Sequence, residues 1–186
     1  MQVVLLSTYD LGHQPFGLAS PAAWLRSHGH QVTSTDLSLD PLPEDTVRAA
    51  RLVAFFLPMH TATRLAVAVI ATVRRLNPQA RLCCYGLYAQ LNAAYLRELG
   101  VATIIGGEFE AELLKLADGH YAAAPDTSLT RLQFQVPDRS GLPPLTSYSK
   151  LRSNGSAKVV GYTEASRGCK HLCRHCPVVN VYQGAF

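Results

Sequence analysis

Short apolar segments alternate with longer amphipathic segments over the first 120 residues, and this rhythm limits the possible folds more than any other feature. Most of the apolar segments are continuous runs, as is typical of strands that are buried on both faces of a sheet. We expect five strands, within residues 2–7, 31–37, 51–58, 80–86 and 101–107. We expect helices between and after them, within residues 20–30, 61–76, 89–100 and 108–119.

Strands that alternate with helices in this way predict a parallel sheet covered on both faces. Right-handed crossovers then give an α/β fold, a Rossmann-like or flavodoxin-like doubly wound five-stranded sheet over residues 1–120. In its first helix, Ser20 is the expected N-cap, Pro21 the first helical residue and Gly29 the stop. Ligands in such sheets bind at the carboxyl ends of the strands, so the candidate binding loops are residues 7–17, 57–62, 85–89 and 106–110.

The pattern breaks after Gly119. Residues 121–156 are rich in proline, serine and glycine and have no sustained period, which is typical of a linker or of a connector draped over a domain. An apolar strand is expected from about Lys158, and a loop with three cysteines follows it. A strand followed by a metal-binding loop is the beginning of a second domain, here residues 157–186, so we expect the chain to be a fragment.

The composition narrows the class of protein. Hydrophobic residues make up 48% of the chain and charged residues only 16%, as in globular proteins. The net charge of +4 is too small to argue for a nucleic acid partner, and no apolar run is long enough to span a membrane. Five cysteines are an odd number for a disulfide framework, so a reducing, cytoplasmic location is expected. Cys83 and Cys84 are adjacent in an expected strand, which favours core positions on opposite faces.

Cys169, Cys173 and Cys176 are the strongest functional signal in the chain. A [4Fe–4S] cluster is held by cysteine thiolates, usually four of them. Three ligands from one loop would leave one iron open, and a chelating amino acid, with its amine and carboxylate, fits that position. Zinc is the alternative, because His171 or His175 could supply the fourth ligand of a structural zinc site, although no second cysteine pair lies nearby.

The spacing Cys-x3-Cys-x2-Cys just after a strand resembles the signature of the radical S-adenosylmethionine enzymes. The resemblance implies a [4Fe–4S] cluster on the three cysteines, with its open iron chelated by the methionine part of S-adenosylmethionine. An electron from a donor such as flavodoxin or ferredoxin would cleave the sulfonium and give a 5′-deoxyadenosyl radical, which attacks a small-molecule substrate. The residue before the last cysteine is commonly aromatic in this family and lies near the adenine; here it is His175.

Residues 1–120 resemble the cobalamin-binding domain that often precedes the cluster domain in this family. The family has glycine-containing turns after the fourth and fifth strands, which let the backbone approach a large flat cofactor. The corresponding residues of this chain are Gly86, Gly106, Gly107 and Glu108. The triplet Gly106-Gly107-Glu108 also spells a motif that binds S-adenosylmethionine in this family, but that motif follows the cysteines, so its position excludes this role here.

The resemblance to cobalamin proteins is weaker after the first strand. Proteins that coordinate cobalt through histidine carry Asp-x-His-x-x-Gly there, whereas Asp10, His13 and Gly17 are spaced differently. His13 is therefore either a cobalt ligand or a loop histidine near the pocket or in solvent. His60, which follows the third strand, either faces the pocket or is solvated.

The resemblance implies methyl transfer to an unactivated carbon if cobalamin is present. Two alternatives stay open: a radical S-adenosylmethionine enzyme whose first domain is only a cap, and a non-catalytic zinc-stabilised module that binds a small molecule. The basic residues Arg167, Lys170 and Arg174 either offset the charge of the cluster or form a solvated loop. The fragment alone is expected to be inactive, because most substrate contacts would lie in the rest of the barrel.

Overall fold

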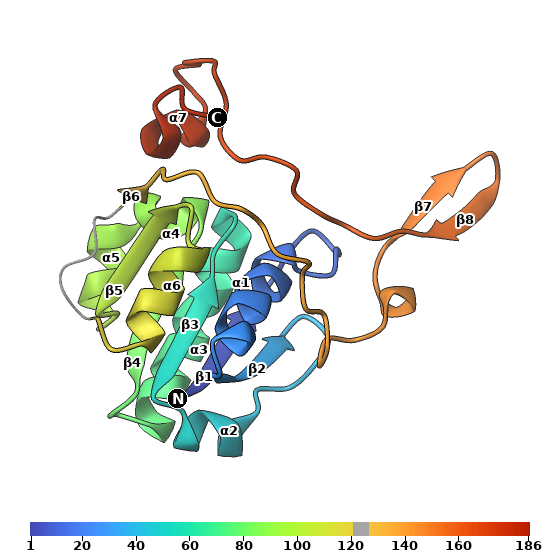
Figure 1. The fold of residues 1–186 in the computed structure, drawn as a ribbon. Coiled ribbons are helices and arrows are strands. Elements are labelled where there is room, and N and C mark those ends of the chain that lie inside the picture. Colours follow the sequence, from blue (N-terminus) through green and yellow to red (C-terminus); the bar gives the residue numbers. More distant parts are fainter. Residues whose placement is uncertain (121–126) are drawn as a thin grey trace.

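The computed structural model describes residues 1–120 and 127–186. Part of the predicted linker, residues 121–126, lies outside the described residues. The centre of the fold is an all-parallel sheet of six strands in the order β2-β1-β3-β4-β5-β6 (Figure 1). The strands are β1 (Gln2–Ser7), β2 (Gln31–Asp36), β3 (Leu52–Phe56), β4 (Arg81–Tyr85), β5 (Thr103–Gly107) and β6 (Thr127–Ser128). The predicted parallel α/β sheet is thus confirmed, with one short strand more than expected, and it is compatible with a Rossmann-like fold.

Helices cover both faces of the sheet and bury an apolar core against each. One face packs against α1 (Phe16–Ser27) and α6 (Glu110–Ala117). The other packs against α2 (Glu44–Ala49), α3 (His60–Leu76), α4 (Leu87–Leu91) and α5 (Ala93–Glu98). Cys83 belongs to the first core and Cys84 to the second, both fully buried, as the alternation of side chains along a strand predicts.

The helix predictions are wrong in three details. The helix expected within residues 89–100 is divided at Asn92 into α4 and α5, and α2 was not expected at all. The first helix begins at Phe16 rather than after Ser20, which places Pro21 inside it. An internal proline has no N–H to donate to the carbonyl four residues earlier, here that of Gly17. The Tyr85 hydroxyl donates to this carbonyl at 2.7 Å instead, so a side chain from β4 makes the internal proline tolerable.

Replacing Tyr85 with phenylalanine should lower the free energy of unfolding by about 1–3 kcal/mol, because the Gly17 carbonyl would be buried without a partner. Urea denaturation measures the loss. The matched background is Pro21→Ala, which restores an N–H for the same carbonyl. The loss should be smaller in that background, and an equal loss in both backgrounds would contradict this account.

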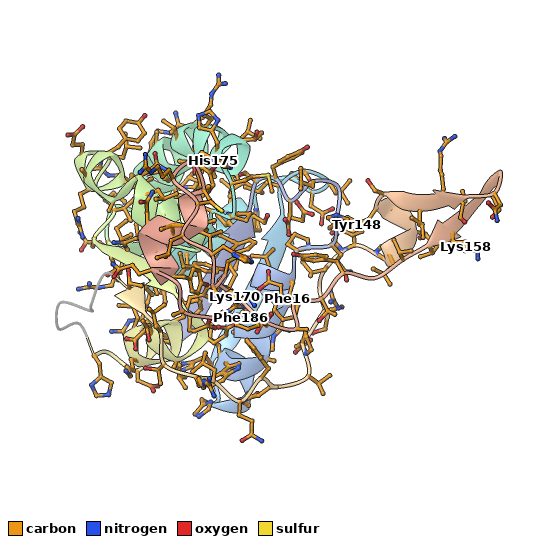
Figure 2. The ribbon with its side chains drawn as sticks, turned by 90° about the horizontal axis from the view of Figure 1, so that it is seen from above. Phe16, Tyr148, Lys158, Lys170, His175 and Phe186 are labelled. Carbon is orange, nitrogen blue, oxygen red and sulfur yellow. The ribbon has the colours of Figure 1, made fainter. Side chains whose placement is uncertain are left out.

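After β6, residues 138–149 run along α1 and the loop that follows β1. The Asp138 N–H donates to Ala19, and the Ser149 N–H donates to Gly12. The chain then forms a 3-10 turn, Leu145–Ser147, and an antiparallel hairpin of β7 (Lys150–Ser153) and β8 (Ser156–Val159). Figure 2 shows Lys158 on this hairpin, which extends away from the sheet.

The apolar strand predicted from about Lys158 is therefore present only as β8, an exposed edge of a two-stranded hairpin. Residues 160–176 form neither helix nor strand, and α7 (Pro177–Tyr182) follows them. We call residues 160–186 the cysteine segment; it lies over the carboxyl end of the sheet (Figure 1). In the part of the chain described here, no helix is both long and apolar enough to cross a membrane.

Candidate functional site

A cavity of about 380 Å³ lies at the carboxyl end of the sheet, and we call it the edge cavity. Its walls include residues from the loops that follow β1, β3, β4 and β5, the four loops in which the sequence predicts ligand binding. Residues of the cysteine segment between Tyr162 and Tyr182 complete the wall. The volume is near the lower end of the range for small-molecule sites.

Three of the five residues predicted for the cobalamin pocket line the edge cavity: His13, Gly86 and Gly107. The His13 ring stacks on the Tyr162 ring, with 4.9 Å between the centroids and 17° between the planes. Both glycines are also required by close backbone packing. A Cβ on Gly86 would lie 3.1 Å from the carbonyl oxygen of the residue after β3, and a Cβ on Gly107 would overlap the carbonyl oxygen of Ser128. The glycines therefore do not by themselves indicate a cofactor.

The other two predicted residues of this set lie elsewhere. Gly106 is buried in β5 and pairs with Thr127 of β6. Glu108 lines a second cavity, of about 540 Å³, between residues 129–134 and the end of the cysteine segment. Its carboxylate is ion-paired with Arg167 at 2.9 Å. The structure thus brings only part of the predicted set together around one cavity.

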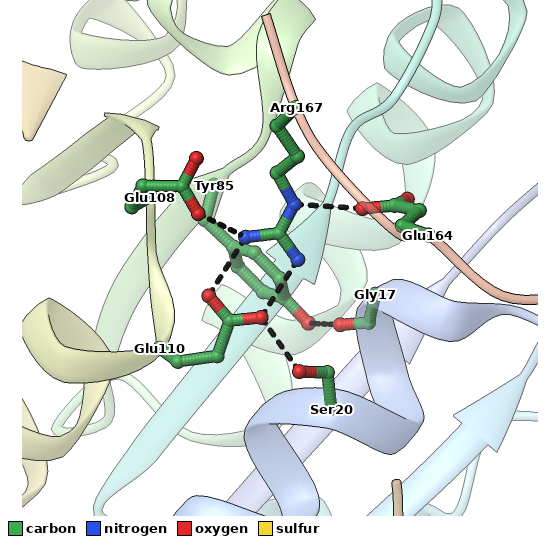
Figure 3. Close-up of polar contacts among 7 residues, drawn as sticks. All are labelled: Gly17, Ser20, Tyr85, Glu108, Glu110, Glu164 and Arg167. Atoms are coloured by element: carbon green, nitrogen blue, oxygen red, sulfur yellow. Dashed lines mark hydrogen bonds and ion pairs between the residues drawn. The ribbon is translucent and has the colours of Figure 1, made fainter. Parts of the chain in front are cut away.

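Arg167 attaches the cysteine segment to the edge of the sheet (Figure 3). Its guanidinium donates hydrogen bonds to Glu164 at 2.6 Å, to Glu108 at 2.9 Å, and to both oxygens of Glu110 at 2.8 and 2.7 Å. Glu110 in turn accepts a hydrogen bond from Ser20 of α1 at 2.6 Å. The Arg167 side chain is 7% exposed and that of Glu110 is fully buried. Bidentate, charge-assisted contacts of this kind are among the stronger polar interactions in proteins.

We call Arg167 and its three ion-paired carboxylates, those of Glu108, Glu110 and Glu164, the Arg167 cluster. One guanidinium faces three carboxylates, and its carbon also lies 4.0 Å from the centroid of the Phe109 ring, within range of a cation–π contact. Burial alone would lower the pKa of Arg167, but the hydrogen bonds and charges of Glu110 and Glu164 outweigh it and raise this pKa. Burial raises the pKa of Glu108 despite the opposing charge of Arg167. The positive charge of Arg167 is therefore fully engaged by these carboxylates.

The three cysteines lie on the loop just before α7. Cys173 is exposed, and Cys169 and Cys176 are partly exposed. Among residues 1–120 and 127–186, no three histidine, cysteine or acidic side chains form a group arranged to hold a metal ion. The donor set nevertheless fits an iron–sulfur cluster, because three accessible thiols stand on one short loop. By contrast, burial raises the pKa of the Cys83 and Cys84 thiols, which disfavours the thiolate that binds metal.

The basic and histidine residues of the cysteine segment differ in exposure: all but Arg167 are exposed to solvent. Lys170, Arg174 and His175 are exposed, and Figure 2 labels the first and last of them. His171 is also exposed and lines a small cavity of about 260 Å³ together with Cys169. Arg167 does not belong to a solvated basic loop, because it is buried among carboxylates. The alternative of a solvated basic loop is therefore wrong for Arg167.

His60 lies outside the edge cavity. It lines a separate cavity of about 330 Å³ beside α3, together with Asn92 and Tyr95. The alternative in which His60 faces the cofactor pocket is thus not the observed arrangement.

Asp10 is a candidate functional residue that the sequence indicated only as part of a motif. It lines the edge cavity, is 8% exposed, and its Oδ2 has no hydrogen-bond partner within the described part of the chain. Burial, and then the charges of Glu164 and Asp36, raise the pKa of Asp10 to about 7. Buried carboxyls with a raised pKa and an unused oxygen are typical of ligand-binding or proton-transfer positions. Glu164 and Tyr162, which share this cavity, gave no signal in the sequence.

Comparison with protein-family models, with curated protein sequences and with solved structures gave no match for this chain.

Proposed function

We propose that this chain is part of a radical S-adenosylmethionine enzyme, with Cys169, Cys173 and Cys176 as the ligands of a [4Fe–4S] cluster. The observation that carries the proposal is the contrast among the five cysteines. The three in the Cys-x3-Cys-x2-Cys spacing are accessible and share one loop, whereas Cys83 and Cys84 are fully buried in the two cores. When bound, such a cluster supplies the electron that cleaves S-adenosylmethionine reductively.

The residues of the chain contribute position rather than chemistry in this proposal. Arg167, two residues before the first cysteine, holds the loop beside α6 and the carboxyl end of β5. The Cys169 N–H donates to the carbonyl of Ala185 at 3.1 Å, which ties the start of the loop to the residues after α7. A cluster on this loop would lie near the edge of the sheet at which ligands of such folds bind.

Cobalamin is the second cofactor that we propose, but the volume of the edge cavity limits how it could bind. At about 380 Å³ the cavity is near the lower limit for small-molecule sites, and a corrinoid is larger than most of their ligands. Cobalamin would therefore bind only if the cysteine segment lifts from the sheet. The small volume favours a second candidate, in which residues 1–120 act as a cap without cobalamin.

Anaerobic reconstitution of the chain with iron, sulfide and hydroxocobalamin, followed by metal analysis, tests these proposals. We expect about four irons per chain, lost in Cys173→Ala and retained in the matched variant Cys84→Ala. Stoichiometric cobalt would support the corrinoid domain, and iron without cobalt would support the cap. Zinc without iron would overturn the proposed function and favour the zinc-stabilised module.

A further inference from the structure

The edge cavity has walls suited to a flat ligand. Phe56, Leu87 and Phe109 provide apolar surface from β3, α4 and the residue before α6. His13 and Tyr162, already stacked on each other, provide aromatic faces from two distant parts of the chain. Apolar and aromatic walls with a few polar groups are the usual lining of a small-molecule site.

Two carboxyl groups and one guanidinium line the edge cavity. Asp10 and Glu164 both line it, and Arg167 is the one basic residue among the described lining residues apart from His13. The Arg167 guanidinium already bonds Glu164 and two further carboxylates, so it has little capacity left for an anionic ligand. The free Oδ2 of Asp10 is a hydrogen-bond acceptor without a donor.

The edge cavity also lacks the usual means of binding phosphate in such folds. Phosphates bind at the N-terminus of the first helix, where unpaired N–H groups meet the positive end of the helix dipole. Here the residue before α1 is Pro15, which has no N–H, and Phe16 and Gly17 are buried. The Leu18 and Ala19 N–H groups already donate to the Pro15 carbonyl.

We propose that the edge cavity is a binding site for a flat, largely apolar ligand that presents N–H donors or positive charge to Asp10, and that it rejects phosphates and carboxylates. This inference does not depend on the iron–sulfur cluster and concerns the metal-free chain. The phosphates of a dinucleotide lie outside this ligand class.

Three probes with the same ring test the proposal: benzamidinium, benzamide and benzoate. They differ in presenting a cationic N–H fork, a neutral N–H group or an anion, and a fork pairs well with a carboxylate. Titrations of the metal-free protein are followed by the NMR amide signals of Gly86 and Gly107, which line the cavity. We expect benzamidinium to bind most tightly, benzamide less tightly and benzoate least. Equal binding of benzoate and benzamidinium, or no shift with any probe, would overturn the proposal.

The variant Asp10→Asn tests the residue assignment, with exposed Asp45→Asn of α2 as its matched control. Losing a hydrogen bond to a charged group should weaken benzamidinium binding about tenfold or more in Asp10→Asn and leave the control unchanged. Binding to the parent chain should strengthen from pH 6 to pH 8 as Asp10 ionises. Glu164, Asp36 and His13 share this environment, so the pH profile of Asp10→Asn is the reference. Unchanged affinity in Asp10→Asn, with its fold intact by urea denaturation, would contradict the role of Asp10.

Discussion

Replacing Arg167 with methionine should detach the cysteine segment from the sheet while the sheet itself stays folded. The change leaves Glu108 and Glu110 without their cation, and removing one partner of a buried ion pair typically costs about 3–5 kcal/mol. The cysteine segment lies at the carboxyl edge of the sheet. If it moves away from the sheet, water can therefore reach the two carboxylates. The loss should therefore appear as local opening rather than as global unfolding.

Hydrogen exchange measures this opening directly. Amides of Val181 and Tyr182, buried in the parent chain, should exchange about a hundredfold faster or more in Arg167→Met, since about 1.4 kcal/mol corresponds to a factor of ten. Amides of β1 and β3 should keep their protection. The matched control is Arg174→Met, which removes an exposed arginine from the same segment and should leave exchange unchanged. Similar exchange in Arg167→Met and Arg174→Met would contradict the proposed role of the Arg167 cluster.

Replacing Gly107 with alanine should lower the free energy of unfolding by several kcal/mol, well beyond the backbone cost of a left-handed residue. Gly107 has φ of +70°, and its Cβ would overlap the Ser128 carbonyl oxygen. That oxygen also accepts the Glu108 N–H at 2.7 Å, so β6 cannot move away without losing this bond. The steric conflict therefore adds to a conformational cost of about 1–2 kcal/mol.

Gly29→Ala separates the two costs. Gly29 has φ of +81°, and nothing lies within 4 Å of its Cβ position, so only the backbone cost applies. Urea denaturation of both variants should show a clearly larger loss for Gly107→Ala. Equal losses would mean that β6 adapts to the methyl group and that the close approach of Ser128 does not constrain the sheet edge.

The sheet was predictable because each of its strands can be recognised from a short stretch of sequence. Each central strand is a continuous apolar run followed by a segment with a helical period, and β3, β4 and β5 follow one another both in the chain and in the sheet. Pro21 misled the prediction for α1, because proline is common in the first turn of a helix. The hydroxyl of Tyr85 bonds the carbonyl of Gly17, 68 residues away in the chain, and so makes an internal proline possible. No local pattern indicates such a contact.

The candidate site was predictable only where one short segment contains it. Cys169, Cys173 and Cys176 stand out by their spacing alone, and their role as cluster ligands stays a prediction. Within the Arg167 cluster, Arg167 bonds Glu110 and Glu108, which lie 57 and 59 residues before it in the chain. Their pairing therefore depends on the tertiary fold. The unpartnered carboxyl of Asp10 depends in the same way on what surrounds it, because exposure and missing hydrogen bonds are not encoded in residue type.

The most direct test of the account is the EPR spectrum of the reconstituted, reduced chain with and without S-adenosylmethionine. We expect a [4Fe–4S] signal that changes when S-adenosylmethionine is added, because three cysteine ligands would leave the fourth iron open to it. The signal should be absent from Cys173→Ala and present in Cys84→Ala. A cluster signal that S-adenosylmethionine leaves unchanged, or no cluster in a correctly folded chain, would contradict the central claim.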